Sequence, residues 1–119
     1  MSYIDGFIIP VATADKDKFV DHARRMDRFF VEHGATRVVE SWGDDIPDGV
    51  VTDFRKAVQA RDDETVVFSW VVWPDKATRD AATKKMETDE AMNEPMPFDG
   101  KRMIFGGFDP ILVLEKDHG

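Results

Sequence analysis

The chain has 119 residues, 42% of them hydrophobic and 11% aromatic, which suits one domain with a buried core and excludes a disordered chain. Its formal net charge of −8 disfavours nucleic acids and anionic membranes as partners. It has no cysteine, no signal-peptide pattern and no apolar run long enough to cross a bilayer, so we expect a cytoplasmic protein.

The first predicted element is a strand. Residues Tyr3 to Val11 are mostly apolar or β-branched, a composition typical of strands. Because proline has no backbone N–H to donate, Pro10 should end this strand and start a turn.

A long helix and a second strand follow. Apolar residues recur at helical spacing between Asp15 and His33, and Gly34 is placed to end the helix. Thr13 or Asp15 is expected to cap its first turn. Thr36 to Trp42 then predicts the second strand.

The middle of the chain combines an acidic connection with the clearest strand of the sequence. Residues 43–63 are rich in turn formers, and Asp53 is expected to cap a short segment that starts at Phe54. Thr65 to Trp73 is apolar on both of its alternating faces, so this strand should lie at the centre of the sheet with both faces covered.

The last third predicts a second helix, a short extra helix and a final strand. Asp75 should cap the second helix, whose alanines at 77, 81 and 82 predict a small-residue face against the sheet. A short helix is expected over 88–92. The final strand is predicted from Arg102 to Leu114, with a bulge or a close approach at Gly106 and Gly107.

This order of elements predicts an α+β fold, with residues 1–119 forming a single ferredoxin-like domain. The order β-α-β-β-α-β describes an antiparallel sheet with both helices on one face, so the other face stays bare. A bare sheet with an apolar central strand exposes more apolar surface than soluble monomers tolerate. We therefore expect a homodimer, with roughly 2,000 Å² or more buried between two sheets.

The sequence resembles the YbaA-like family of uncharacterised small bacterial proteins over nearly its whole length. The segments that carry the resemblance are Tyr3–Phe7, Ser41–Asp45, Pro47–Gly49, Thr52–Arg55, Val67–Trp70 and Met96–Phe108. The resemblance implies a ferredoxin-like fold and a dimeric α/β barrel, and it brings no catalytic residues. The wider superfamily includes cofactor-independent monooxygenases, isomerases and haem-binding proteins, so the fold alone does not identify a function.

Asp5 is a carboxylate in an otherwise apolar strand, which makes it a candidate catalytic residue. A buried carboxylate must be paired, hydrogen-bonded or protonated, so Asp5 could serve as an acid or base in a cleft. The alternative is a structural pairing, with Arg102 or a backbone amide as the partner.

The histidines predict no metal site. His22 and His33 are eleven residues apart on one helix, roughly 16 Å along its axis, and His118 lies far away in the sequence. Without cysteines or closely spaced histidines we predict neither a metal nor a cofactor. His22 could still act as a general base or as a lone haem ligand, against the alternative of a packing residue.

Four residues are candidates for ligand binding. Trp42 and Trp70 could line a pocket for a planar molecule, although strand aromatics also serve as core or interface. The hydroxyl of Ser69 could face the space between sheet and helices, and Arg102 is a candidate polar contact. No base stands at a recognisable spacing from Ser69, which argues against covalent catalysis.

The leading hypothesis is a homodimer that binds a small apolar or aromatic molecule in a cleft beside the sheet. If it is an enzyme, the residues favour cofactor-free proton transfer or oxygenation, of an isomerase or monooxygenase kind, with Asp5 or His22 as acid or base. The alternative is a non-enzymatic interaction protein whose apolar faces serve only dimerisation. An RNA-associated role ranks third because of the net acidity.

Overall fold

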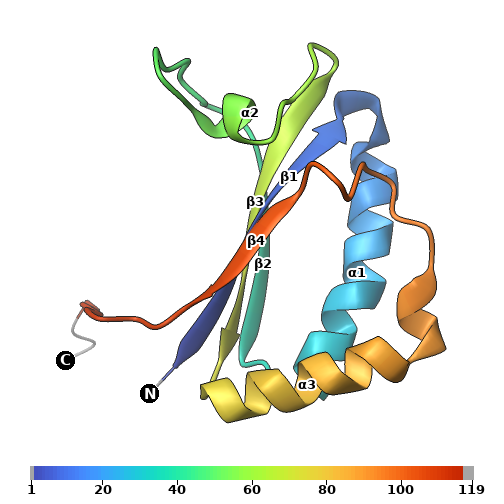
Figure 1. The fold of residues 1–119 in the computed structure, drawn as a ribbon, viewed down its shortest axis with the longest axis vertical. Helices are drawn as coiled ribbons and strands as arrows, with labels where there is room; N and C mark the ends of the chain where they lie inside the picture. The colour runs from blue at the N-terminus through green and yellow to red at the C-terminus, as the bar shows by residue number, and fades with distance from the viewer. Residues whose placement is uncertain (1, 117–119) are drawn as a thin grey trace.

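A computed structural model describes residues 2–116 and shows a four-stranded antiparallel sheet with the long helices on one of its faces (Figure 1). The strands are β1 (Tyr3–Ala12), β2 (Arg37–Trp42), β3 (Glu64–Trp73) and β4 (Ile104–Phe108). The α-helices are α1 (Lys16–Glu32), α2 (Phe54–Ala57) and α3 (Lys76–Thr88), and two 3-10 turns are η1 (Thr13–Asp15) and η2 (Glu90–Asn93). The strand order in the sheet is β2-β3-β1-β4.

Strand β3 is central, as its sequence predicts. It pairs antiparallel with β1 on one side and with β2 on the other. Val67, Val71 and Trp73 point towards the helices and are each no more than 2% exposed. The alternate residues point to the opposite face, which α1 and α3 leave uncovered (Figure 1). Helix α2 reaches only one end of that face, where Phe54 packs against Phe68 with ring centroids 6.0 Å apart.

Three predicted helix ends and the short extra helix are confirmed, and one predicted cap is wrong. Asp53 accepts a hydrogen bond from the Lys56 amide and caps α2, and Asp75 caps α3 in the same way. Gly34 follows α1 with φ = 112°, a left-handed conformation that glycine adopts readily. The short extra helix is present as η2. Asp15 makes no capping hydrogen bond, because the chain enters α1 through η1.

Only one of the three alanines predicted for the sheet-facing side of α3 is buried there. Ala82 is 3% exposed and packs with Ala35, Val71 and Trp73, whereas the alanines at 77 and 81 are exposed. Helix α3 therefore contacts the sheet through a narrower stripe than the sequence suggests.

Pro10 does not end the first strand, which continues to Ala12. Pro10 lies opposite Val66, whose carbonyl accepts a hydrogen bond from the Gly43 amide on the β2 side. Backbone groups of one residue point to the same side of an antiparallel strand, so Pro10 belongs to a pair that exchanges no hydrogen bonds. Its missing N–H would face the side of β1 on which β4 lies. Strand β4 begins at Ile104, opposite Ile8, so it has no residue beside Pro10.

The double glycine forms no bulge, because β4 pairs with β1 in an uninterrupted register that sets Gly106 opposite Gly6. The predicted close approach is real at Gly107. A Cβ atom there would overlap the Tyr3 hydroxyl oxygen, so the tyrosine ring occupies the space of the missing side chain. The ring of Tyr3 in turn lies 5.2 Å from the guanidinium carbon of Arg79.

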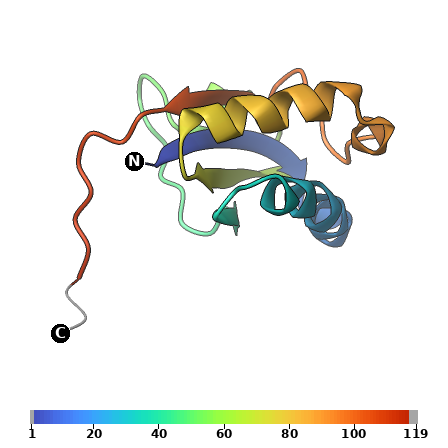
Figure 2. The same cartoon turned by 90° about the horizontal axis from the view of Figure 1, so that it is seen from below.

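Strand β4 is much shorter than predicted. It ends at Phe108, and residues 109–116 leave the sheet as an extended segment on the side away from the helices (Figures 1 and 2). We call residues 109–116 the C-terminal segment.

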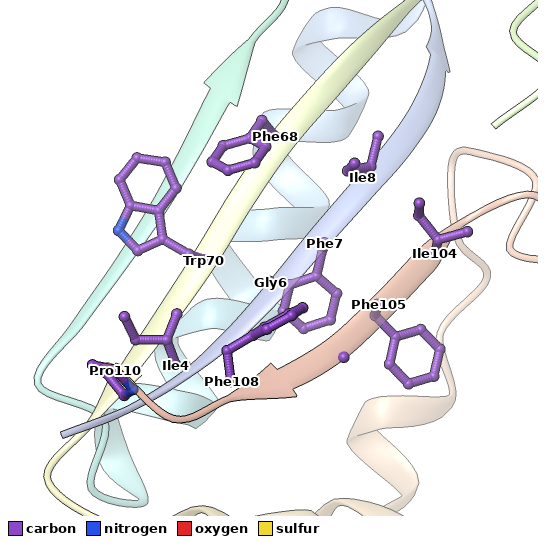
Figure 3. A pocket seen from close by; sticks show the side chains of 11 residues that line it. Ile4, Gly6, Phe7, Ile8, Phe68, Trp70, Ile104, Phe105, Phe108 and Pro110 are labelled. Atoms are coloured by element: carbon purple, nitrogen blue, oxygen red, sulfur yellow. The ribbon is translucent and has the colours of Figure 1, made fainter. Parts of the chain in front are cut away.

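The uncovered side of the sheet is apolar, and we call it the open face. Its main side chains are Ile4, Ile8, Phe68, Trp70, Ile104 and Phe108. They surround a shallow hollow of about 580 Å³ (Figure 3). Apolar patches of this extent on soluble proteins usually mark an interaction site.

An ion-pair cluster around Arg102 fastens the segment before β4 to the start of β3. The Arg102 guanidinium contacts both carboxylate oxygens of Glu64, at 2.7 and 2.8 Å, and Asp99 at 2.9 Å. It also donates a hydrogen bond to the Gln59 carbonyl. The side chains of Arg102 and Glu64 are only 12% and 9% exposed, so this cluster is largely shielded from solvent.

The same cluster predicts a loss of stability in acid. Hydrogen bonds from Arg102 lower the pKa of Glu64 to about 2, below the 4.5 expected for the unfolded chain. The depressed pKa stabilises the fold above pH 4.5, and that contribution is lost as the pH falls towards 2. We expect urea unfolding to give a Glu64 contribution of about 2 kcal/mol at pH 6 that disappears near pH 2. A Glu64→Gln variant should lack this part of the pH dependence, and an unchanged profile would contradict the prediction.

Candidate functional site

A cavity of about 120 Å³ lies between α1 and the helix-facing side of the sheet. Most of its wall is apolar and includes Phe7, Phe19 and Phe98. Four of the lining side chains carry polar groups, namely His22, Asp27, Glu40 and Ser69. An apolar pocket with a few convergent polar groups is the usual form of a small-molecule site.

Two carboxyl groups meet at this cavity, Asp27 from α1 and Glu40 from β2. Glu40 is exposed along the free edge of β2, but its carboxyl is crowded by protein atoms. This desolvation, together with the hydrogen bond to Asp27, raises the pKa of Glu40 to about 9. Desolvation also raises the pKa of Asp27. Neighbouring carboxyls resist double ionisation, so the pair retains a proton at neutral pH.

Ser69 completes the polar side of the cavity. It lies opposite Glu40 in the β2–β3 register and is only 3% exposed. Its side chain hydrogen-bonds Glu40, which opposes the rise in the pKa of that carboxyl. The serine is thus a partner of the carboxyl pair.

His22 enters the cavity from α1 and is fixed by a distant carboxylate. Its Nδ1 lies 2.7 Å from Oε1 of Glu94, and Arg25 holds the same carboxylate with contacts of 3.0 Å. Hydrogen bonds from Arg25 lower the pKa of Glu94, so this group is ionised and Nδ1 must donate. In the neutral imidazole Nε2 is then the acceptor, as a general base requires.

Asp5 lies outside this cavity. The guanidinium of Arg79 contacts both of its oxygens, with Nη2 of Arg79 at 2.8 Å from Oδ1, and Trp73 Nε1 donates at 2.9 Å to Oδ2. The expected pairing with Arg102 is wrong, because Arg102 is held by Glu64. The ion pair with Asp5 raises the pKa of Arg79.

The remaining candidate residues also lie elsewhere. Trp42 packs against Phe19, with ring centroids 6.4 Å apart, and the Lys16 ammonium lies over the Trp42 ring, 5.6 Å from its centroid. Trp70 belongs to the open face, and Arg102 to the ion-pair cluster described above. Of the predicted site residues, the structure brings only His22 and Ser69 to one cavity.

His33 does not line this cavity. His33 stacks on Phe29, with ring centroids 3.9 Å apart, and its Nδ1 lies 2.8 Å from the carbonyl oxygen of Phe29. His118 lies outside the described residues. Within residues 2–116 no three His, Cys, Asp or Glu side chains are grouped as metal ligands would be, and no helix there is long and apolar enough to cross a membrane.

Three site residues are missing from the sequence-based prediction. Asp27 was detectable, since it interrupts the apolar stripe of α1 next to Met26. Glu40 was also detectable, because it alternates with Val38 and Trp42 on one face of β2. Glu94 had no local signal, since it meets His22 from 72 positions away in the sequence.

The chain has clear relatives. Residues 2–100 match a family described as "Protein of unknown function (DUF1428)". The chain is 51% identical over 115 residues to "Uncharacterized protein YbaA" of Escherichia coli strain K12, covering 94% of this chain and 98% of the relative. A protein of the same name from Shigella flexneri matches equally well. Among solved structures, "De novo designed protein Foldit4" is similar, with a TM-score of 0.43, 12% identity and coverage of 91% and 94%. From the match over residues 2–100 and the identity along almost the full length of these relatives, the chain belongs to the YbaA-like family of proteins of unknown function.

Proposed function

We propose that this protein is a cytoplasmic homodimer of ferredoxin-like subunits, forming a dimeric α/β barrel, that binds a small apolar or aromatic molecule between α1 and the sheet. The observation that carries the proposal is the cavity in which His22 and the Asp27–Glu40 pair meet an aromatic wall. Its volume of about 120 Å³ compares with the roughly 150 Å³ of an engineered cavity that holds benzene. The ligand should therefore contain a single ring or an equivalent number of atoms.

The polar groups suit proton transfer on such a ligand without a cofactor. In its neutral form His22 has Nε2 as an acceptor, while Glu94 holds its other nitrogen. The Asp27–Glu40 pair retains a proton at neutral pH, which Glu40 shares with Asp27 and which a ligand acceptor would compete for. A base and an acid at one apolar cavity form the pair of groups that an isomerase-like reaction needs. The acid–base role falls to these residues in preference to Asp5, whose oxygens are already engaged.

The protonated carboxyl pair predicts a pH-dependent affinity for hydrogen-bond acceptors. Cyclopentanone and benzene have the same number of heavy atoms, and only the ketone accepts a hydrogen bond. Because the pKa of Glu40 is raised to about 9, its proton is present below that pH and lost above it. We expect cyclopentanone to bind about tenfold more weakly at pH 10 than at pH 7, and benzene to bind equally at both, as measured by NMR titration.

A Glu40→Gln variant should remove this pH dependence while preserving the size of the side chain. Glu87→Gln, at an exposed position on α3, is the matched control and should behave as the unmodified protein does. Equal pH profiles for the two ring compounds would contradict a role for the carboxyl pair. Failure of both compounds to perturb the residues of the cavity would contradict the binding site itself.

Native mass spectrometry tests the proposal without a chosen ligand. The protein purified from its own host should have the mass of a dimer and carry a small adduct. A dimer without an adduct would favour a second candidate, an interaction protein whose apolar faces serve only dimerisation. That candidate is supported by the open face, whose hollow is wide, shallow and devoid of charged lining residues.

A further inference from the structure

The C-terminal segment carries an apolar stretch that has no cover in its own chain. Ile111, Leu112, Val113 and Leu114 are consecutive, and 62–97% of each residue is exposed. The segment leaves the sheet on the side of the open face and runs away from the body of the protein (Figures 1 and 2). Four exposed aliphatic residues in a row are unfavourable in water, so this stretch needs an apolar surface to pack on.

The open face is the matching surface. The C-terminal segment begins at its rim, because Phe108 and Pro110 both line the hollow. No charged side chain lines this hollow, although the chain as a whole has a net charge of −8. Packing there would bury apolar side chains without desolvating an ion.

The direction of the segment favours a second copy of the chain over the same copy, because the segment runs away from its own sheet (Figure 1). Residues 109–114, when extended, span about 20 Å. The four strands of one sheet, at about 4.8 Å spacing, are about 14 Å wide from first to last. The segment is therefore long enough to run along the rim of a facing subunit's open face while the two sheets pack against each other. A twofold axis would repeat this contact for the second segment.

We infer that residues 111–114 of each subunit pack against the open face of its partner, so that the two subunits exchange C-terminal segments. This inference rests on the homodimer proposed above and adds a reciprocal contact to it. The segment then closes the rim of the hollow that face-to-face packing alone leaves open. Replacing Ile111, Leu112, Val113 and Leu114 together by Ser should raise the dissociation constant of the dimer at least tenfold.

Photo-crosslinking of the full chain tests the inference directly. The protein has no cysteine, so a Leu112→Cys variant takes a benzophenone maleimide at one site only. Leu112 is 75% exposed, and the substitution should leave the fold intact. Lys84→Cys, on the exposed side of α3, is the matched control and should give no crosslink between subunits. Mixing isotope-labelled with unlabelled chains distinguishes links between subunits from links within one.

The outcomes separate the two proposals. Crosslinked peptides of mixed isotope that join residue 112 to β1, β3 or β4 would support the exchange. Links confined to one chain, in a protein that sediments as a dimer, would overturn the exchange and leave the homodimer standing. A protein that sediments as a monomer at micromolar concentration would overturn the homodimer and the exchange together.

Discussion

Replacing Arg102 by Met should lower the free energy of unfolding by more than the loss of an exposed arginine does, because it leaves Glu64 without its partner. Arg102 contacts both oxygens of Glu64 and also binds Asp99 and the Gln59 carbonyl. Its removal therefore affects three separate parts of the chain. Chemical denaturation at pH 7 measures the loss.

The double variant Glu64→Gln with Arg102→Met tests the cause. If the cost comes from the unpaired carboxylate, the double variant should be more stable than Arg102→Met alone. Arg28→Met, at an exposed position on α1, serves as the control and should change the free energy of unfolding by less than about 0.5 kcal/mol. Equal losses in the single and double variants would show that the unpaired carboxylate of Glu64 is not the cause of the loss.

The second large effect is expected at the open face, where Phe68→Asp should convert the proposed homodimer to a monomer. Phe68 is 44% exposed and packs beside Trp70, with ring centroids 5.4 Å apart. A carboxylate there would be desolvated between two sheets without a partner. We expect the dimer dissociation constant to rise at least a thousandfold, which corresponds to about 4 kcal/mol. Sedimentation equilibrium measures this change.

Two further variants distinguish this effect from general damage. Phe68→Leu keeps the surface apolar and should remain a dimer. Val50→Asp adds the same charge at a residue that is 99% exposed and lies off the open face, so it should also remain a dimer. Circular dichroism should show the Phe68→Asp monomer to be folded, because Phe68 is not part of the helix-side core. An unchanged dimer in Phe68→Asp would place the interface elsewhere.

The sequence predicts well those parts of the fold that depend on interactions within a single segment. The double-sided apolar pattern of β3 marks a central strand wherever it pairs. Asp53 and Asp75 cap helices through backbone amides three residues away, and Gly34 needs only its own backbone freedom. These interactions are local and therefore readable from the sequence.

Apart from the Asp15 cap, which is local, the details that the sequence does not predict depend on pairings between distant segments. The end of β4 depends on where β1 offers a partner, and the apolar run at 111–114 looks the same in sequence whether or not it is paired. At Gly107 the neighbour is Tyr3, which no sequence spacing indicates. The sequence pattern identifies these strands correctly, but it does not determine the register in which they pair.

The candidate site divides in the same way. His22 and Ser69 could be predicted to face the space between helix and sheet, since the helical and strand periods place them there. Asp5 and Arg102 are polar residues of the kind found in active sites, and both instead form ion pairs, with Arg79 and Glu64 respectively. Long-range ion pairs of this kind decide which polar residues remain available to a ligand.

Pro10 has a consequence for how the sheet ends beyond β4. Past Ile8 no strand of the described residues lies beside this edge of β1, yet Pro10 is less than 2% exposed, so other parts of the chain cover it. A residue with an N–H at this buried position would need a hydrogen-bond acceptor, whereas proline has no N–H to satisfy. The end of β1 can therefore be buried without another strand beside it.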